Sequence, residues 1–465
     1  MSASPTGTEP GLPGTGAPNS IWSAEHRALT VGLSLTVTLV AFESLAVATI
    51  MPEVQDDLGG LALYGWVFSG FFLASLIGIV LAGQLADRRG LALPFGLGLA
   101  LFAAGLVVGG AAQSMPMLVA GRLAQGFGAG AIPAVAYAAI GRGLPNPLRP
   151  VMFATMSTAW VVPGLIGPAI ASGVEHLWTW RIVFLGLLPI LAVAFVMTLP
   201  VLRTLDQANP AAPAPLDQRR LLRVVILVLG VGAVLAATDV PLAVAVALVV
   251  AGVPAAAWAF GVLQPPGTAR LAPGVPATVA VRGLLTCAFF TGDAYVSLAI
   301  VDGRGADTWV AGLALTAGAV CWTLGAWTQA RAIERFGPRR LVGIGMTIIA
   351  TGLTALVVSL AYLPIAVSIV VWGFAASGMG LAYPTLSVTV LALAARGEEG
   401  AASSALQLSD TLGQAIGTGV GGGIIAIADA KGWTVTTGTS IVFVMALVVA
   451  LTGVLASRRL PASTD

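Results

Sequence analysis

Residues 83–90, GQLADRRG, lie between two apolar runs that are each long enough to cross a membrane. A stretch with three charges in so apolar a chain is expected to lie in water at a membrane surface. Residues 329–340, QARAIERFGPRR, repeat the pattern in the second half of the chain, with Glu334 and Arg335 as the charged pair and Gly337 as the closing glycine. The two stretches therefore predict matching loops in two homologous halves.

The composition is that of a membrane protein. Hydrophobic residues make up 57% of the 465 residues and charged residues only 9%, whereas about 25% of the residues of soluble proteins are charged. The long runs are continuously apolar rather than alternating, which favours helices over the strands of a β-barrel. We therefore expect an all-α polytopic protein in a lipid bilayer. The net charge of +2 gives no reason to expect a nucleic-acid partner.

Apolar spans predict fourteen transmembrane helices, arranged as six, two and six. The predicted spans are 28–51, 63–83, 92–112, 117–140, 151–174, 180–201, 221–238, 240–262, 277–300, 308–330, 340–360, 364–386, 401–427 and 437–457. The linker 202–220 before the middle pair is rich in Pro and Ala. The middle pair is therefore expected to be an insertion between two larger units.

Sequence features that recur about 250 residues apart predict two parallel repeats. Glu43 and Asp293 stand at matching depths in the first and ninth spans. Matching small-residue positions are 121, 126 and 128 with 373, 378 and 380, and the tract 167–174 with 413–420. The predicted units are a disordered tail (1–27), an N-terminal six-helix bundle (28–201), linkers with two extra helices (202–276), a C-terminal six-helix bundle (277–457) and a second tail (458–465).

The placement of basic residues predicts the orientation. Arginines such as Arg88 and Arg340 gather on the loops that an inside N-terminus would put in the cytoplasm, while the other face keeps Arg181, Arg304 and the single lysine, Lys431. This is the positive-inside pattern, so both termini are expected in the cytoplasm. The scarcity of lysine with abundant alanine and glycine is typical of a high-GC bacterial genome, which favours a bacterial plasma membrane.

Four segments of the chain resemble the major facilitator superfamily, most closely its fourteen-helix drug:proton antiporter branch. Residues 83–90 resemble the family's loop between helices 2 and 3, with Leu91 and Ala92 in place of the usual basic pair. The other three segments are Leu118, Arg122, Gln125, Gly126 and Gly128 of the helix 4 motif, residues 163–168 (PGLIGP) of the helix 5 antiporter motif, and residues 42–52 (FESLAVATIMP) of the first-helix signature. The resemblance implies export in exchange for protons by alternating access.

Three carboxylates and one arginine in the apolar spans are candidates for proton coupling. An ionised carboxylate without a partner is costly in a membrane, so Glu43 and Asp293, and more weakly Asp410, are expected to load and release a proton. Arg122 cannot shed its charge. By family analogy, it faces the cavity beside an acid such as Glu43. The alternative is that these groups only brace helices. Arg282, near a span edge, is expected to reach the membrane interface.

Gly83, Asp87, Arg88 and Gly90, with their counterparts Glu334 and Arg335, are expected to form a conformational latch. A carboxylate on this loop can accept hydrogen bonds from the N-terminus of another helix. A contact formed in one conformation and broken in the other would bias the equilibrium between inward-open and outward-open states. The alternative is a solvated charge cluster that only fixes topology.

Pro163, Gly164, Gly167 and Pro168 of the antiporter motif are expected to kink a helix and to pack it tightly, which would seal one end of the cavity against proton leak. Six other side chains are expected to line the substrate cavity, where aromatic walls suit large apolar or cationic molecules. They are Gln125, Tyr137, Trp160, Tyr295, Phe374 and Tyr383. The alternative for each aromatic residue is packing in the core or against lipid.

The sequence lacks the signs of an enzyme or of a cofactor. It has no Gly-x-x-x-x-Gly-Lys phosphate loop, and His26 and His176 stand far apart. We therefore expect a monomeric, proton-coupled exporter of small amphiphilic compounds, of the multidrug efflux type and without cofactor or metal. The alternatives are export of a lipid or an endogenous metabolite, proton-coupled uptake, and a membrane binding or scaffold protein that does not transport.

Overall fold

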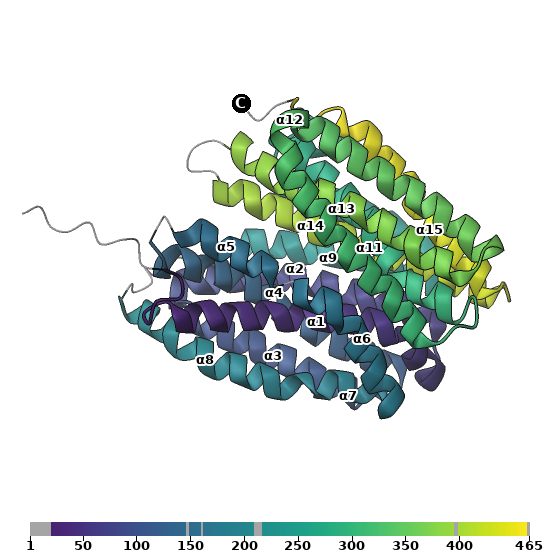
Figure 1. Cartoon of the computed structure of the whole chain (residues 1–465), viewed down its shortest axis with the longest axis horizontal. Helices are drawn as coiled ribbons and strands as arrows, with labels where there is room; N and C mark the ends of the chain where they lie inside the picture. Colours follow the sequence, from purple (N-terminus) through teal and green to yellow (C-terminus); the bar gives the residue numbers. More distant parts are fainter. Residues whose placement is uncertain (1–19, 146–147, 160, 209–215, 395–398, 463–465) are drawn as a thin grey trace, which may run out of the picture.

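A computed structural model of the protein describes residues 20–145, 148–159, 161–208, 216–394 and 399–462. All regular secondary structure in these ranges is helical (Figure 1). The α-helices are α1 (Arg27–Leu58), α2 (Tyr64–Arg89), α3 (Ala92–Gly110), α4 (Met115–Gly143), α5 (Arg149–Thr158), α6 (Val161–Leu177), α7 (Trp180–Leu185), α8 (Leu187–Ala208), α9 (Gln218–Ala236), α10 (Leu242–Leu263), α11 (Val275–Val301), α12 (Thr308–Tyr362), α13 (Ile365–Leu393), α14 (Glu399–Ala430) and α15 (Val435–Ser457).

Eleven helices of the described part are long and apolar enough to cross a membrane. The chain is therefore a multi-pass membrane protein, but the predicted count of fourteen spans is not confirmed. The span predicted at 151–174 is divided between the short helices α5 and α6. The span predicted at 221–238 lies in α9, whose first turns carry Arg219, Arg220 and Arg223. The two spans predicted between 308 and 360 run together as α12.

The helices form two packed groups, with the α9–α10 pair beside them. Helices α1 to α8 pack mainly on one another, and so do helices α11 to α15; Figure 1 shows the first group below and the second above. Helix α9 packs against α2 and α14, where Leu227 and Leu235 meet Leu73 and Leu412. Helix α10 packs on α9 and is otherwise mostly exposed. The inserted pair thus lies against both groups mainly through α9 and the short helical turn Ala237–Asp239 that follows it.

Small residues let the helices within each group approach closely. A side chain at Gly126 of α4 would clash with the backbone of Phe71 in α2. The matching position in the second group, Gly378 of α13, lies against the backbone of Gly345 in α12. Such close approach gains many dispersion contacts, which matter in a membrane because lipid tails offer no hydrophobic driving force for helix association.

The two matching loops have the same backbone conformation. Gly90 follows α2 with a φ of 82°, and Gly337 interrupts α12 with a φ of 70°. This left-handed region favours glycine because a Cβ atom is crowded there. Gly337 explains why the long α12 contains two of the predicted spans: the chain turns at this residue and then resumes a helix. The loop conformation is consistent with the predicted internal repeat.

The two groups of helices contact each other near one end of the bundle, which we call the closed end. It holds the connections 59–63 and 302–307. Gly65 of α2 packs directly on Gly422 of α14, and a Cβ at Gly312 of α12 would lie 3.3 Å from the carbonyl oxygen of Pro168 in α6. The backbones of the two groups therefore meet with almost no side chain between them.

The other end, which we call the terminus end, holds the start of α1 and the end of α15. Here α9 links the groups through hydrogen bonds. Gln84 of α2 donates to the carbonyl oxygen of Asp217, at 3.3 Å, and Arg220 of α9 donates to the hydroxyl of Ser404 in α14, at 3.0 Å. The described contacts between the groups thus differ at the two ends: backbone packs on backbone at one, and polar side chains act through an inserted helix at the other.

The Gly126 contact predicts a clear effect of a larger side chain. Gly126→Val forces α2 and α4 apart, because the new Cβ would overlap the backbone of Phe71. We expect a loss of about 1–3 kcal/mol or more of stability, measured as a lower midpoint of thermal unfolding in detergent. Gly141→Ala in the same helix is the control, because a Cβ there meets nothing within 4 Å. Equal midpoints for the two variants would contradict the close packing.

Candidate functional site

The first candidate site is an ion pair buried in the N-terminal group. Glu43 of α1 accepts a hydrogen bond from Nη1 of Arg122 in α4, and their side chains are only 1% and 3% exposed. Arg122 also donates from Nε to the carbonyl oxygen of Val67, at 3.0 Å, and from Nη1 to Oε1 of Gln125, at 2.9 Å. Its guanidinium lies over the ring of Phe71, 4.3 Å from the centroid. One arginine thereby joins α1, α2 and α4.

This site has unused hydrogen-bonding capacity. The second carboxylate oxygen of Glu43, Oε2, is buried and has no hydrogen-bond partner among the described residues, and neither has Nε2 of Gln125. A buried polar atom without a partner is costly, and a carboxylate can relieve this cost by taking up a proton. Both side chains are buried and the partners of Arg122 come from α1, α2 and α4, so Arg122 lies beside Glu43 and neither side chain is exposed in this conformation.

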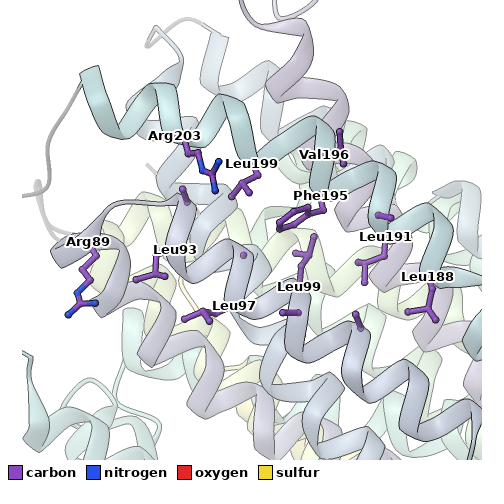
Figure 2. Close-up of a pocket in the computed structure, with 15 residues that line it drawn as sticks. Arg89, Leu93, Leu97, Leu99, Leu188, Leu191, Phe195, Val196, Leu199 and Arg203 are labelled. Carbon is purple, nitrogen blue, oxygen red and sulfur yellow. The ribbon is translucent and has the colours of Figure 1, made fainter.

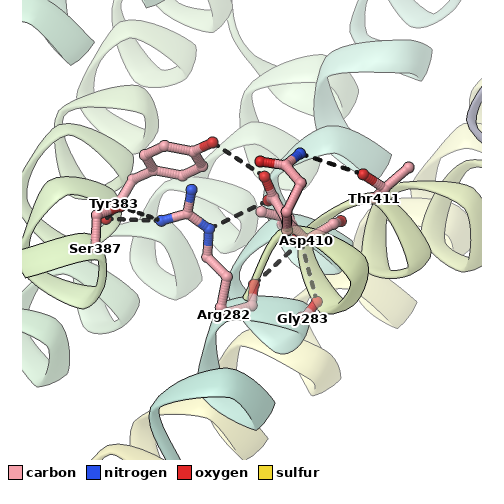
Figure 3. A network of polar contacts seen from close by, with 8 residues as sticks. Arg282, Gly283, Tyr383, Ser387, Asp410 and Thr411 are labelled. Atoms are coloured by element: carbon pink, nitrogen blue, oxygen red, sulfur yellow. Dashed lines mark hydrogen bonds and ion pairs between the residues drawn. The ribbon is translucent and has the colours of Figure 1, made fainter. Parts of the chain in front are cut away.

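The second candidate site is another buried ion pair, in the C-terminal group, shown in Figure 3. Arg282 of α11 donates from Nε to Oδ1 of Asp410 in α14, at 3.2 Å. Its Nη1 donates to the carbonyl oxygen of Tyr383, at 2.7 Å, and to the hydroxyl of Ser387, at 3.2 Å. The Tyr383 hydroxyl in turn donates to Oδ2 of Asp410, at 3.0 Å. This network joins α11, α13 and α14.

The prediction that Arg282 reaches the membrane interface is wrong. Its side chain is 3% exposed and its guanidinium lies 3.0 Å from the centroid of the Tyr383 ring. A carboxylate 128 positions further along the chain supplies the partner, and sequence distance concealed it. Arg282 therefore belongs with the candidate site residues that the sequence did not identify.

The two ion pairs differ in one chemical respect. Both carboxylate oxygens of Asp410 accept hydrogen bonds, one from Arg282 and one from Tyr383. Glu43 uses only one of its two oxygens. Hydrogen bonds to the charged form of a carboxylate favour that form. The geometry therefore makes Asp410 the better-stabilised anion, and Glu43 the carboxylate with a site free for a proton.

Asp293 has a third kind of environment. It lies in α11, is partly exposed, and has no hydrogen-bond or ion-pair partner among the described residues. Its chain neighbours are at the interface of the two groups: the Tyr64 hydroxyl of α2 approaches the carbonyl oxygen of Ala294, at 3.5 Å, and the ring of Tyr64 lies 5.6 Å from that of Tyr295. Asp293 thus stands alone beside the contact between the groups.

Half-buried aromatic rings connect the interface to the second ion pair. The ring of Phe72 in α2 lies 6.5 Å from that of Phe290 in α11, which lies 6.3 Å from Trp322 in α12. Trp322 lies 5.7 Å from Tyr383, the ring below Arg282. These four rings come from both groups and are all partly exposed. Together the four rings form a row, which we call the aromatic wall, that ends at the Arg282–Asp410 ion pair.

The residues predicted for a substrate cavity are not all placed to face one. Gln125 and Tyr295 are fully buried, the first against Arg122 and the second with its hydroxyl on the carbonyl oxygen of Thr418, at 2.6 Å. Tyr137 is 49% exposed and lies within electrostatic range of Arg282 and Asp410 in the other group. Phe374 is 46% exposed. Trp160 lies outside the described residues.

The predicted latch residues do not meet the N-terminus of another helix in this conformation. The Asp87 side chain is 72% exposed and lies 3.4 Å from Nη2 of Arg142 in α4. Gly83 has open space beside it, and Glu334 and Arg335 are exposed. The predicted contact is made instead by Asp206 of α8.

Asp206 accepts from the backbone N–H groups of Leu91 and Ala92, at 2.7 and 2.9 Å, at the start of α3. A carboxylate is favoured there because of the unpaired N–H groups and the helix dipole. The same carboxylate leaves no room for a side chain at Gly90. The sequence carried no signal for this contact beyond an acid near the end of a predicted span.

Two of the antiporter-motif residues, Gly164 and Pro168, lie at the contact between the groups. Pro163, Gly164, Gly167 and Pro168 are all buried in α6. A Cβ at Gly164 would lie 2.8 Å from Cβ of Ala319 in α12, and one at Gly167 would lie 3.4 Å from the Phe42 ring of α1. Gly164 and Pro168 therefore belong to the surface of α6 that packs on α12 of the other group, whereas Gly167 packs on α1 of its own group.

Carboxylates gather at the closed end. The Thr308 hydroxyl of α12 donates to Glu53 of α1, at 3.1 Å, and so links the two groups. Burial, and then the charges of Asp56 and Glu53, raise the pKa of Asp302 to about 6. Asp57, by contrast, accepts from Trp180 and Arg181, at 3.0 and 2.8 Å. Asp302 is thus an acid at this end whose charge is opposed by its surroundings.

The fold and the buried charges together define a class of protein: a membrane transporter built from two groups of helices that meet at one end. Comparison with known proteins agrees. Residues 33–328 match the family model described as Major Facilitator Superfamily, and the chain belongs to that family. Among the described residues no group of three or more His, Cys, Asp or Glu side chains is placed to hold a metal ion.

A relative and a solved structure resemble the chain over most of its length, and a second relative resembles a shorter part of it. A protein of Mycobacterium tuberculosis named as a probable multidrug-efflux transporter is 29% identical, covering 94% of this chain and 97% of its own. The multidrug efflux pump SdrM of Staphylococcus aureus is 26% identical over 36% of this chain and 38% of its own. The crystal structure of a POT family transporter in complex with 5-aminolevulinic acid has a TM-score of 0.67, at 16% identity, covering 93% of this chain and 96% of its own.

Removal of one charge of the buried Glu43–Arg122 pair is expected to destabilise the protein more than removal of both charges. Arg122→Met leaves the Glu43 carboxylate buried without a counterion, which typically costs about 3–5 kcal/mol. We expect a strongly lowered midpoint of thermal unfolding at neutral pH. Arg122→Met combined with Glu43→Gln should recover part of that loss. If the single and double variants unfold at the same temperature, the loss comes from arginine packing rather than from a stranded charge.

Proposed function

We propose that the protein is a multidrug exporter of the Major Facilitator Superfamily that exchanges protons for small amphiphilic compounds. The observation that carries the proposal is the buried Glu43–Arg122 pair with one free carboxylate oxygen, in a chain that resembles named multidrug-efflux transporters along nearly its whole length. A passive membrane protein gains nothing from the desolvation cost of such a pair.

Proton exchange would act mainly through Glu43. Its free oxygen can take a proton, which weakens the attraction to Arg122 and loosens the joint between α1, α2 and α4. Asp293, partly exposed beside the interface, is a second candidate proton carrier. Asp410 stays the weaker candidate, because Arg282 and Tyr383 satisfy both of its oxygens in the ionised form.

The substrate would lie against the aromatic wall. Phe72, Phe290, Trp322 and Tyr383 offer partly exposed ring faces from both groups of helices. Ring faces attract organic cations and bury apolar surface, which suits amphiphilic compounds of varied shape. Tyr137, half exposed, would form part of the opposite side.

Alternating access would come from rocking of the unit 28–201 against the unit 277–457. The terminus end would be cytoplasmic in a bacterial plasma membrane, so the described conformation would be closed on the outside. In this arrangement the chain crosses the membrane fourteen times. Helices α5 and α6 together make one crossing, α9 makes another, and α12 makes two, one on each side of Gly337. Export of a lipid or metabolite, and proton-coupled uptake, use the same parts and remain the alternative transport functions.

Transport by purified full-length protein in proteoliposomes tests the exchange mechanism. A pH gradient is imposed, and a panel of cationic and neutral amphiphiles is offered. Glu43→Gln keeps an acceptor for Arg122 but holds no titrating proton, so it should bind compounds and lose the response to the gradient. Asp429→Asn, at an exposed acid, is the matched control.

Three outcomes would count against the proposal. If Glu43→Gln transports every tested compound with unchanged pH dependence, the proton site is elsewhere. If the unaltered protein moves compounds only along with protons, it is an importer. If it binds compounds and moves none in either gradient, the binding-protein alternative holds.

The pKa of Asp302 predicts the pH dependence of the closed end. The pKa of about 6 in the closed form would fall toward an ordinary aspartate value near 3.9 once this end opens and water reaches the carboxyl. The closed form therefore binds the proton more tightly. Its stabilisation is complete below about pH 4 and is lost as the pH rises through 6.

Distances between spin labels on L177C and A430C, in a background without Cys287 and Cys321, would report on this end. We expect one short distance at pH 5 and a growing long component at pH 7.5. Asp302→Asn should remove most of that change, whereas Asp307→Asn, at an exposed acid nearby, should keep it. An unchanged pH response in Asp302→Asn would show that another group sets it.

A further inference from the structure

A groove of about 800 Å³ runs along the outside of the N-terminal group, between α3 and α8. Figure 2 shows its course: Arg89 and Arg203 lie at one end, and Leu188 lies at the other. Every other lining residue is Leu, Ala, Val, Phe or Gly. Figure 1 shows α3 and α8 at the edge of the molecule away from α12 and α15. The groove is therefore separate from the candidate proton and substrate sites.

The size of the groove fits one leaflet of a membrane. Its lining runs from Ala92 to Ala103 on α3 and from Leu188 to Arg203 on α8, which is about 17 and about 22 Å of helix at 1.5 Å per residue. Half of a hydrocarbon core is about 15 Å thick. Leu97 and Val196 at its rim are 49% and 68% exposed. An acyl chain can thus lie along the groove with its polar end at the arginines.

The two arginines are available for an anion. Both are exposed, and among the described residues neither makes a hydrogen bond or an ion pair. The nearest acid on α8, Asp206, already accepts from the N–H groups of Leu91 and Ala92. A guanidinium binds a phosphate through paired hydrogen bonds. The charges thus complement an anionic phosphodiester at the level where a lipid headgroup lies.

We propose that this groove is a binding site for an anionic phospholipid, whose acyl chain lies between α3 and α8 and whose phosphate lies between Arg89 and Arg203. The bound lipid would join the end of α2 to the end of α8. Asp206 joins α8 to the start of α3 in the same place. The lipid would therefore hold the 83–90 loop to the rest of its group.

Native mass spectrometry of the full-length, delipidated protein tests this site. Phosphatidylglycerol and phosphatidylcholine with the same acyl chains are added in turn. The unaltered protein should retain phosphatidylglycerol preferentially and unfold at a higher temperature with it. Arg89→Gln combined with Arg203→Gln should lower that preference by at least roughly tenfold, because phosphatidylcholine, which has a phosphate but no net charge, loses less binding.

Two further variants test whether the effect depends on the position of the arginines and on the space in the groove. Arg340→Gln with Arg458→Gln removes the same charge from exposed sites in the C-terminal group and should leave the preference intact. Ala100→Phe fills the groove without a change in charge and should weaken binding of both lipids. The proposal fails if the double arginine variant keeps its preference, if Ala100→Phe binds both lipids normally, or if the groove is covered by a second copy of the chain and a dimer forms instead.

Discussion

A guanidinium inside a bundle of membrane helices cannot lose its charge. The rest of this structure depends on which groups pair with that charge and accept its hydrogen bonds. Arg122 is met by a carboxylate, an amide oxygen, a backbone carbonyl and a ring face from three helices. The contacts to Glu43 of α1 and to Val67 and Phe71 of α2 fix the distances between helices, because the cost of separating the ion pair in a medium of low dielectric is high. Arg122 thus holds α1, α2 and α4 of the N-terminal group together.

The C-terminal group solves the same problem in a different way. Arg282 also joins three helices, yet its partner Asp410 has both oxygens occupied, whereas Glu43 has one free. The two groups of helices thus carry one ion pair whose carboxylate oxygens both accept hydrogen bonds and one whose carboxylate keeps a free oxygen. This difference is the reason why we propose Glu43, rather than Asp410, as the main proton carrier.

Contact between the halves depends on small residues at one end of the bundle. Gly65 on Gly422 and Gly312 beside Pro168 bring backbones together with little side-chain surface between them. Carboxylates at the same end, Asp302 among them, oppose closure when they are ionised. Close packing and repulsion thus act on the same interface in opposite directions. Such an interface can be switched by a small free-energy change, which a transporter that alternates between two states requires.

Much of the fold could be predicted from the sequence, because membrane burial forces long apolar runs and the repeat places matching loops at Gly90 and Gly337. The sequence also singled out Glu43, Asp293 and Arg122, since a charge well inside an apolar span is costly unless it has a partner or a function. Sequence spacing could not count the helices securely. A kink at Gly337, a break between α5 and α6, and arginines at the start of α9 blur the apolar signal.

The partners were decided by tertiary structure alone. Arg282 and Asp410 are 128 residues apart, and Asp206 lies 115 residues from the N–H of Leu91. No local pattern connects such residues. The sequence by itself determined which groups are too costly to bury alone; only the packing of helices decided which of them found a counterion, which kept a free oxygen and which stayed exposed. The physical reason is that desolvation cost is a property of one residue, whereas its compensation depends on which distant groups the folded chain brings within hydrogen-bond distance.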